Sequence, residues 1–235
     1  MNRLSSDGYV ILPDVVPDAH IQILINALEA HRQSKGDSAE AGLRNLAGTL
    51  AEIDELRGSG ALLDIASSVL GQRAFVVRTL FFDKTPNANW KVAWHQDLTI
   101  AVRERMDAPG FGPWSVKDGI PHVQPPAELL ERMITLRLHL DSCDATNGAL
   151  RVLPGSHLAG KFNAEQIRDW RSRTAEVTCE VPRGGLLLMR PLLLHASSPA
   201  TEPRHRRVLH FEFAAESLPA KLAWYEAEPF ATPAF

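Results

Sequence analysis

The sequence predicts a mainly β domain with flanking helices, in which an antiparallel sandwich or barrel forms the core. Helical periodicity is concentrated in the first 71 residues of a chain of 235. From residue 74 onward, short β-branched and aromatic runs alternate with turns at roughly regular spacing, which is typical of sandwiches and barrels. The sequence contains no internal repeat and no clear linker. We therefore expect residues 1–235 to form a single domain, with the N-terminal helices packed on the outside of the β core.

The N-terminal third is predicted to be one short strand followed by helices. Residues 8–16, "GYVILPDVV", favour a strand that is interrupted at its proline. A helix is expected over residues 18–33, because an aspartate can cap its start and four apolar residues follow at helical spacing: Ile21, Leu24, Ile25 and Leu28. After a loop at "SKGDS", residues 39–70 are predicted to be mostly helical, with a break near residues 58–60 and a stop at Gly71.

The remaining two thirds are predicted to be mostly short strands. Residues 103–128 are the exception, because they are rich in Gly and Pro and show little periodicity. A loop of this length inside a compact domain is usually functional, so we expect a lid or a binding loop there. Residues 162–173 favour a short helix or a lid segment. Strand-like runs are expected at residues 74–83, 90–102 and 131–143, once within 144–157, three times within 174–200, and last at 206–215.

The composition is that of an ordinary globular protein and excludes several classes of partner. The net charge is −3 and the pI is about 6.3, so no basic field is available for nucleic acid or an anionic membrane. The two cysteines, Cys143 and Cys179, lack the spacing of a zinc site or a disulfide framework and indicate reduced thiols. The N-terminal residues argue against a signal peptide, and no uncharged apolar run reaches membrane-spanning length. We therefore expect a cytoplasmic protein with a small-molecule substrate; the oligomeric state stays open.

The motif "WHQD" carries two potential metal ligands in a strand-like run. His95 and Asp97 are two residues apart, so on a strand they point to the same face, with Gln96 on the other. Two histidines and one carboxylate on one face form the facial triad of non-haem Fe(II) oxygenases, which leaves coordination positions open. The alternative is a buried histidine that hydrogen-bonds to a strand neighbour. A second histidine from elsewhere in the chain is needed to favour the metal site.

His195 is the strongest candidate for that second histidine. It ends "GGLLLMRPLLLH", the most hydrophobic run of the chain, and a polar ring at the end of a buried strand needs a partner such as a metal. His157 follows a Pro-Gly-Ser turn, and the remaining histidines lie on predicted helices, loops or strands without such a context: His20, His31, His122, His139, His205 and His210.

Five segments together resemble the phytanoyl-CoA dioxygenase family of Fe(II)- and 2-oxoglutarate-dependent oxygenases. They are "DGYVILPDVV", "WHQD", "NGALRVLPGSH", "LLLHASSP" and "RRVLHFEF", and they occur in the family's order over nearly the whole chain. The resemblance implies a double-stranded β-helix core, the jelly-roll or cupin-like fold. It also implies that Fe(II) is the metal, that 2-oxoglutarate and O2 are co-substrates, and that the iron ligands are His95, Asp97 and His195.

The resemblance further implies the residues that bind 2-oxoglutarate. Arg206 lies eleven positions after His195, where such enzymes hold the distal carboxylate, and a planar guanidinium suits a bidentate carboxylate contact. Arg207 is adjacent, and strand alternation places only one of the two inside. Three further residues match positions near the co-substrate in the family, although Lys84 is as readily explained as a solvated turn lysine: Ser197, Trp114 and Lys84.

The implied reaction is hydroxylation of an unactivated C–H bond of a small molecule, with release of succinate and CO2. Because Asp97 is present, halogenation is disfavoured: related halogenases have a small residue at this position. Residues expected to contact the substrate lie in or near the long loop: Trp94, Phe111, Trp114, Lys117 and His122. On the strand at 131–143, the usual arrangement puts the leucines inside. The reverse arrangement places Arg137 and His139 in the cavity and suggests an anionic or polar substrate group.

Three other classes remain open from the sequence. A cupin-type metal enzyme that does not use 2-oxoglutarate needs the three ligands but not Arg206. A non-catalytic ligand-binding relative tolerates loss of a ligand or of the arginine, and neither is lost here. A zinc hydrolase on the same ligands does not explain an arginine placed for a dicarboxylate.

Overall fold

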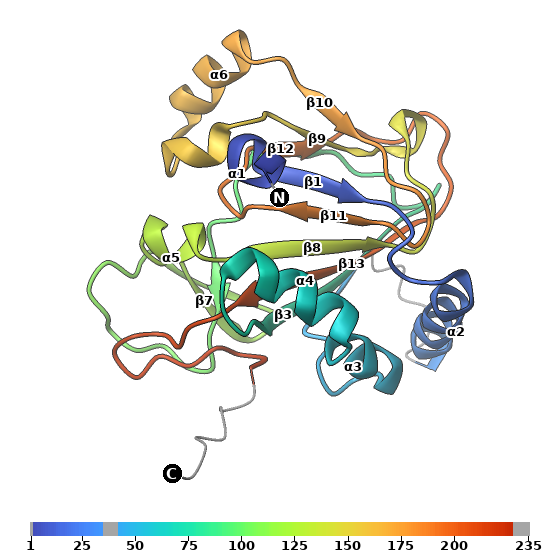
Figure 1. The fold of residues 1–235 in the computed structure, drawn as a ribbon, viewed down its shortest axis with the longest axis horizontal. Coiled ribbons are helices and arrows are strands. Elements are labelled where there is room, and N and C mark those ends of the chain that lie inside the picture. Colours follow the sequence, from blue (N-terminus) through green and yellow to red (C-terminus); the bar gives the residue numbers. More distant parts are fainter. Residues whose placement is uncertain (1, 35–41, 228–235) are drawn as a thin grey trace.

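The computed structural model describes residues 2–34 and 42–227, and this part of the chain forms three antiparallel sheets (Figure 1). The largest has the strand order β1-β11-β8-β13-β3-β2, the second β10-β9-β12-β4 and the third β5-β7-β6. None of the sheets is closed into a barrel. The predicted mainly β class with helices on the outside is confirmed.

The element bounds follow the chain order. The helices are α1 (Asn2–Asp7), α2 (Asp18–Ser34), α3 (Ala51–Arg57), α4 (Gly60–Leu70), α5 (Ala127–Glu131) and α6 (Ala164–Arg173), with 3-10 turns η1 (Ala145–Asn147) and η2 (Ser156–Ala159). The strands are β1 (Tyr9–Leu12), β2 (Gly42–Arg44), β3 (Phe75–Lys84), β4 (Val92–His95), β5 (Ile100–Ala101), β6 (Trp114–Lys117), β7 (Ile120–Val123), β8 (Ile134–His139), β9 (Leu150–Val152), β10 (Val177–Cys179), β11 (Leu186–Met189), β12 (His195–Ser197) and β13 (Arg206–Ala214).

The main sheet is buried on both faces, which decides the orientation of its side chains. Helices α2, α3 and α4 cover one face (Figure 1), where Leu136, Leu138 and Phe211 join the largest apolar cluster. The other face turns toward the second sheet, and there Leu187 and Met189 pack on Leu150 and other apolar residues. Every residue of β8 is therefore buried. The leucines of β8 lie under the helices, and its polar residues lie between the sheets. The sequence analysis treats these as alternatives for the buried face, but both faces of this strand are buried.

Residues 42–44 differ from the sequence prediction because they form an edge strand rather than a helix. Gly42, Leu43 and Arg44 pair with β3, and their run is too short to give a readable periodicity. The rest of the predicted helical segment is as expected. It is divided into α3 and α4, and Gly71 ends α4 with a φ of +73°, which favours glycine. Residues 39–41 of the prediction lie outside the described residues.

The segment 103–128, for which the sequence predicts a lid or binding loop, contains a β-hairpin. Strands β6 and β7 pair across the two-residue turn Asp118-Gly119, in which φ is +50° and +77°. Positive φ at both central residues is the type I′ pattern that Asp-Gly favours, and this signal was present in "VKDGIP". The preceding run, 90–102, divides between β4 and β5, which belong to different sheets. The hairpin brings Lys117 to a pocket.

Candidate active site

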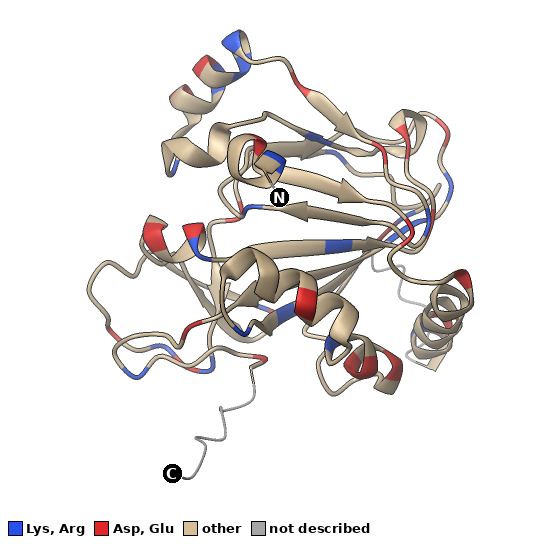
Figure 2. Ribbon diagram, in the orientation of Figure 1, with Lys and Arg blue, Asp and Glu red and all other residues tan. Residues whose placement is uncertain are grey.

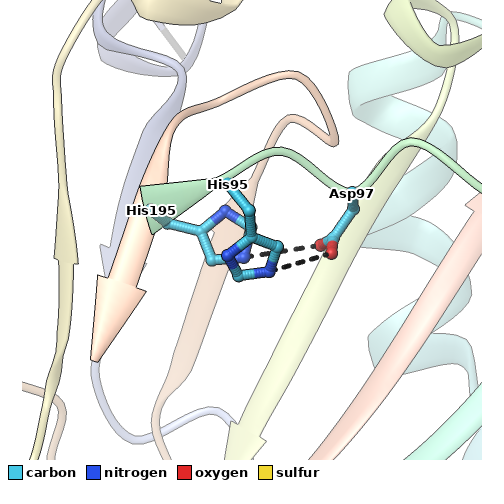
Figure 3. Close-up of side chains that lie close together, drawn as sticks. All are labelled: His95, Asp97 and His195. Atoms are coloured by element: carbon cyan, nitrogen blue, oxygen red, sulfur yellow. Dashed lines mark ion pairs between the residues drawn. The ribbon is translucent and has the colours of Figure 1, made fainter. Parts of the chain in front are cut away.

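Three side chains from the second sheet and the loop after it form a compact cluster of metal-ligand type (Figure 3). His95 ends β4, His195 begins β12, and these two residues are cross-strand neighbours. Asp97 lies just past the end of β4, where its backbone N–H donates to the carbonyl of Pro191. One donor atom from each of the three side chains lies within 4.8 Å of the other two. The structure thus brings together the three residues that the sequence predicts as ligands.

Hydrogen bonds set both histidines in the tautomer that a metal needs. Nδ1 of His95 is 2.8 Å from the carbonyl oxygen of Ala93, and Nδ1 of His195 is 2.9 Å from that of Leu193. A carbonyl only accepts, so each Nδ1 carries the proton and each Nε2 has a free lone pair. Both Nε2 atoms lie 3.7 Å from an oxygen of Asp97 (dashed lines in Figure 3). Three electron-pair donors therefore converge without a proton between them.

The Asp97 carboxylate has no hydrogen-bond partner for one oxygen, which fits a missing cation. Its Oδ2 is buried without a partner in the described part of the chain. Burial alone raises the pKa of Asp97, but His195, His210, His95 and Arg137 outweigh it and lower the pKa to about 2. Burial lowers the pKa of His195 to about 4. At neutral pH Asp97 is thus a carboxylate and His195 a neutral imidazole, donor types that a divalent transition metal prefers.

Gln96 holds the strand end that carries these ligands. Its side chain is buried, and its Nε2 donates to the carbonyls of Gly160 and Leu192 at 2.8 and 2.7 Å. The N–H of Phe162 donates to its Oε1 at 2.8 Å. Three hydrogen bonds to two other segments fix the backbone between His95 and Asp97.

The cluster lies in a pocket of about 450 Å³, within the usual range for small-molecule sites. Of the proposed ligands and co-substrate residues, His95, Asp97, His195, Ser197 and Arg206 line it. Of the proposed substrate contacts, only Lys117 and Arg137 do so. The other lining residues are not among the site residues predicted from the sequence: Arg44, Arg78, Leu80, Phe82, Trp90, Val92, Gln96, Leu98, Thr99, Gln124, Leu150, His210 and Glu212.

The side chain of Arg206 faces the pocket, whereas that of Arg207 lies on the opposite face of β13. The side chain of Arg206 is buried, lines the pocket and donates to the carbonyl of Gly148. No carboxylate lies within 4 Å of its guanidinium in the described chain. Arg207, on the opposite face of β13, forms ion pairs with Asp141 and Glu29. A buried arginine that faces a pocket without an acidic partner is suited to an anionic ligand.

Lys84 is the cross-strand neighbour of Arg206 and lies at the same end of the pocket without lining it. It is 1% exposed, and its Nζ donates to Ser197 Oγ at 3.0 Å and to the Ser198 carbonyl at 2.6 Å. Burial, followed by the charge of Arg206, lowers the pKa of Lys84 from 10.5 to about 7. The side chain is not a solvated turn lysine.

This buried amine predicts a pH dependence of stability. Between the folded pKa of about 7 and the unfolded value of 10.5, the unfolded chain binds a proton that the folded chain does not. The free energy of unfolding should therefore rise with pH in this window, by up to about 1.4 kcal/mol per pH unit from Lys84 alone. In urea unfolding at pH 7, 8 and 9, the difference between the wild type and Lys84→Met should change by roughly 2 kcal/mol. Lys91→Met, at an exposed lysine, should show a constant difference; a constant difference for Lys84→Met contradicts the assignment.

A chain of buried polar groups forms the floor of the pocket. Arg137 Nη1 lies 2.8 Å from His210 Nδ1, so that nitrogen accepts and the proton of His210 is on Nε2. That Nε2 lies 3.4 Å from Glu212 Oε1, which also pairs with Arg78 at 3.2 Å. The charge of Glu212 is thus balanced by that of Arg78. Arg137 has no carboxylate within 4 Å among the described residues.

Several predicted contacts do not reach the pocket. Trp94 is adjacent to His95 on β4, so it points to the opposite face, where the guanidinium groups of Arg151 and Arg171 lie over its ring. Trp114 is three residues from Lys117 on β6 and faces away from the pocket for the same reason. The remaining three do not line the pocket either: Phe111 packs in the apolar cluster around the third sheet, His122 is buried on β7 of that sheet, and His139 is buried at the end of β8.

The fold and the three converging ligands define a class of protein: a double-stranded β-helix with a facial-triad metal site. A family model described as Phytanoyl-CoA dioxygenase (PhyH) matches residues 4–208. The chain therefore belongs to the phytanoyl-CoA dioxygenase family, as the sequence motifs predict. A search of curated proteins finds no match.

Solved structures with the same fold include oxygenase-type enzymes. AviO1 from Streptomyces viridochromogenes Tue57 is 20% identical with a TM-score of 0.65, and the match covers 93% of each chain. The non-haem α-ketoglutarate-dependent carbocyclase SnoK is 15% identical with a TM-score of 0.71, covering 96% of this chain and 85% of that one. EctD from S. alaskensis, with 2-oxoglutarate and 5-hydroxyectoine, is 16% identical with a TM-score of 0.70, covering 91% and 74%. Family and fold together indicate an oxygenase-type enzyme.

The described residues contain no helix that is both long and apolar enough to span a membrane.

Proposed function

We propose that this protein is an Fe(II)- and 2-oxoglutarate-dependent oxygenase that hydroxylates an unactivated C–H bond of a small molecule. The observation that carries the proposal is the convergence of His95, Asp97 and His195 in one pocket with a buried arginine that lacks an acidic partner. The triad alone fits any facial-triad metal enzyme, and Arg206 adds a site for a dicarboxylate. EctD, with the same fold, was solved with bound Fe and with 2-oxoglutarate.

Each residue has a physical role in this proposal. The free Nε2 lone pairs of His95 and His195 and the ionised Asp97 would hold the ion and leave positions open beside it. Bound Fe(II) supplies the oxidative chemistry, in which O2 and 2-oxoglutarate are consumed and succinate and CO2 are released. Arg206 would bind the distal carboxylate of 2-oxoglutarate, with Ser197 at its side. Lys84 keeps Ser197 oriented through its hydrogen bond.

Apolar side chains line part of the pocket and limit the access of water to the reacting groups. They are Leu80, Phe82, Trp90, Val92, Leu98 and Leu150. A dry cavity strengthens charge interactions inside it and protects a reactive centre from side reactions. The small molecule to be oxidised would occupy the part of the pocket that 2-oxoglutarate leaves free.

The proposal is tested by adding Fe(II) and then 2-oxoglutarate to the apo protein under anaerobic conditions. A weak charge-transfer band in the middle of the visible spectrum is expected, because it requires both facial-triad iron and a chelating 2-oxo acid. Iron binding without a band would favour a cupin-type enzyme that does not use 2-oxoglutarate. Absence of iron binding would leave the fold as a non-catalytic scaffold and contradict the proposal.

The hydroxylation outcome has a separate test. With the band established, succinate release is measured against a library of small molecules, and the product of any stimulating compound is analysed by mass spectrometry. A gain of one oxygen atom is expected. A product with two fewer hydrogens or an inverted centre would replace hydroxylation with another outcome. The structural neighbour SnoN, for example, is a non-haem α-ketoglutarate-dependent epimerase.

A further inference from the structure

The pocket has two ends that lie along the paired strands β13 and β3. On β13 and β3, Arg206 is opposite Lys84 and Glu212 is opposite Arg78, six residues further along. At about 3.3 Å per residue this places the two pairs roughly 20 Å apart along the sheet. Between these two pairs, the even-numbered residues that line the pocket are Arg78, Leu80, Phe82, Arg206, His210 and Glu212. Arg206 therefore marks one end, and the Arg78–Glu212 pair marks the other.

The far end of the pocket carries three cations from three different elements. Arg78 comes from β3, Arg44 from the edge strand β2, and Lys117 from the β6–β7 hairpin, and all three line the pocket. Figure 2 shows the unusual placement of basic residues on strands of the main sheet, at β3 and β8, while acidic residues gather on the outer helices and loops. Positive charge at this end is thus built by tertiary packing rather than by a sequence cluster.

Lys117 is the cation of this group without an acidic partner. Arg78 is paired with Glu212 at 3.2 Å, and Arg44 with the hairpin-turn residue Asp118 at 3.1 Å. The Nζ of Lys117 is half-buried and donates only to Thr99 Oγ1, at 3.0 Å, with no carboxylate within 4 Å in the described chain. Burial lowers its pKa, and the charges of Arg78 and Arg44 lower it further. An anionic group beside Lys117 would stabilise its charged form and so offset the effects of burial and of the two arginines.

The charge of the whole pocket supports an anionic occupant. Its lining contains five arginine or lysine side chains but only two carboxylates, Asp97 and Glu212. A divalent metal and dianionic 2-oxoglutarate cancel each other, so they leave this excess unchanged. This excess of positive charge has to be balanced by water, by salt ions or by the substrate. A half-buried ammonium group is stabilised best by a negatively charged oxygen.

We propose that the substrate of this enzyme carries a carboxylate or phosphate group that binds Lys117 at the end of the pocket opposite Arg206. The inference rests on the proposed function, because it assumes that 2-oxoglutarate occupies the Arg206 end. Thr99 completes the contact with its hydroxyl, and Arg78, held by Glu212, adds to the positive field. The reacting C–H bond then lies between the anionic group and the metal ligands. A pocket of about 450 Å³, shared with the co-substrate, suits a small acid or small phosphate ester.

The test uses matched probes on protein loaded with Mn(II) and 2-oxoglutarate, which does not turn over. Hexanoate is compared with hexanamide and benzoate with benzamide; benzyl phosphate is compared with benzyl alcohol. Paramagnetic broadening of each probe's NMR signals gives its dissociation constant in the pocket. Anionic members should bind about tenfold more tightly than their neutral partners, as one partly desolvated charge pair contributes. The carboxylate and phosphate arms decide which anion the site prefers.

Lys117 variants assign the preference. Lys117→Gln should remove it, Lys117→Arg should keep it, and Lys91→Gln, which neutralises an exposed lysine, should leave it unchanged. The inference is overturned if acids bind no better than amides, if none binds, or if Lys117→Gln weakens both classes equally. It is also overturned if excess 2-oxoglutarate displaces the acids, because they then occupy the co-substrate site. Failure of the proposed function is distinct, since it appears as the missing Fe(II) and 2-oxoglutarate band.

Discussion

Replacing His195 with alanine should weaken Fe(II) binding by roughly 100-fold or more and abolish the visible band with 2-oxoglutarate. Loss of a residue that merely orients a ligand typically costs 10–100-fold in affinity, so loss of a ligand should cost at least about that much. Asp97→Ala should have the same effect, because it removes the anionic donor. Affinity is measured by anaerobic titration with Fe(II), and folding by circular dichroism.

His157→Ala is the matched control for this experiment. His157 is also a largely buried histidine, and its place in the motif "PGSH" makes it an alternative candidate ligand. Its Nε2 lies 3.2 Å from the carbonyl oxygen of Ser5, which is not a residue of the triad. Its loss should lower stability without changing Fe(II) affinity. If His157→Ala and His195→Ala weaken iron binding equally, the assignment of the triad is wrong.

The second large effect is expected at Arg206. Arg206→Ala should raise the dissociation constant for 2-oxoglutarate at least about 30-fold, since truncating one partner of a buried, hydrogen-bonded charge pair costs about 2–5 kcal/mol. Fe(II) binding should persist, because none of the three ligand residues contacts the guanidinium in the hydrogen bonds and ion pairs of the structure. The measurement is a titration of the visible band with 2-oxoglutarate on the iron-loaded protein.

Arg207→Ala provides the control at the adjacent position. It removes the same charge and the ion pairs with Asp141 and Glu29 on the outer face, so stability should fall slightly while 2-oxoglutarate affinity stays within about twofold. Loss of 2-oxoglutarate affinity in both variants would indicate a general electrostatic effect. Unchanged affinity in Arg206→Ala would contradict the assignment of Arg206 to the distal carboxylate and would require another residue to bind it.

The amino-acid sequence by itself predicted the class of fold, and it also predicted the three side chains that the structure brings together as candidate metal ligands. His95 and Asp97 follow from strand periodicity, and His195 follows from a polar ring at the end of a very hydrophobic run. Alternation along β13 places only one of Arg206 and Arg207 inside, and the family resemblance selects Arg206. These placements could be predicted because they depend on local geometry, which repeats every two residues on a strand, and on motifs whose order follows the chain.

The tertiary structure alone decided which further residues share the pocket. Lys117, Arg44 and Arg78 are far apart in the sequence and share the pocket because the edge strand β2 pairs with β3 in the main sheet and the β6–β7 hairpin brings Lys117 to the same pocket. Periodicity assigns a side chain to a face but does not say what that face meets. On β8 both faces are buried, so Arg137 lines the pocket while its leucine neighbours lie under helices. These further members of the pocket are set by long-range packing, which a local pattern of residues does not encode.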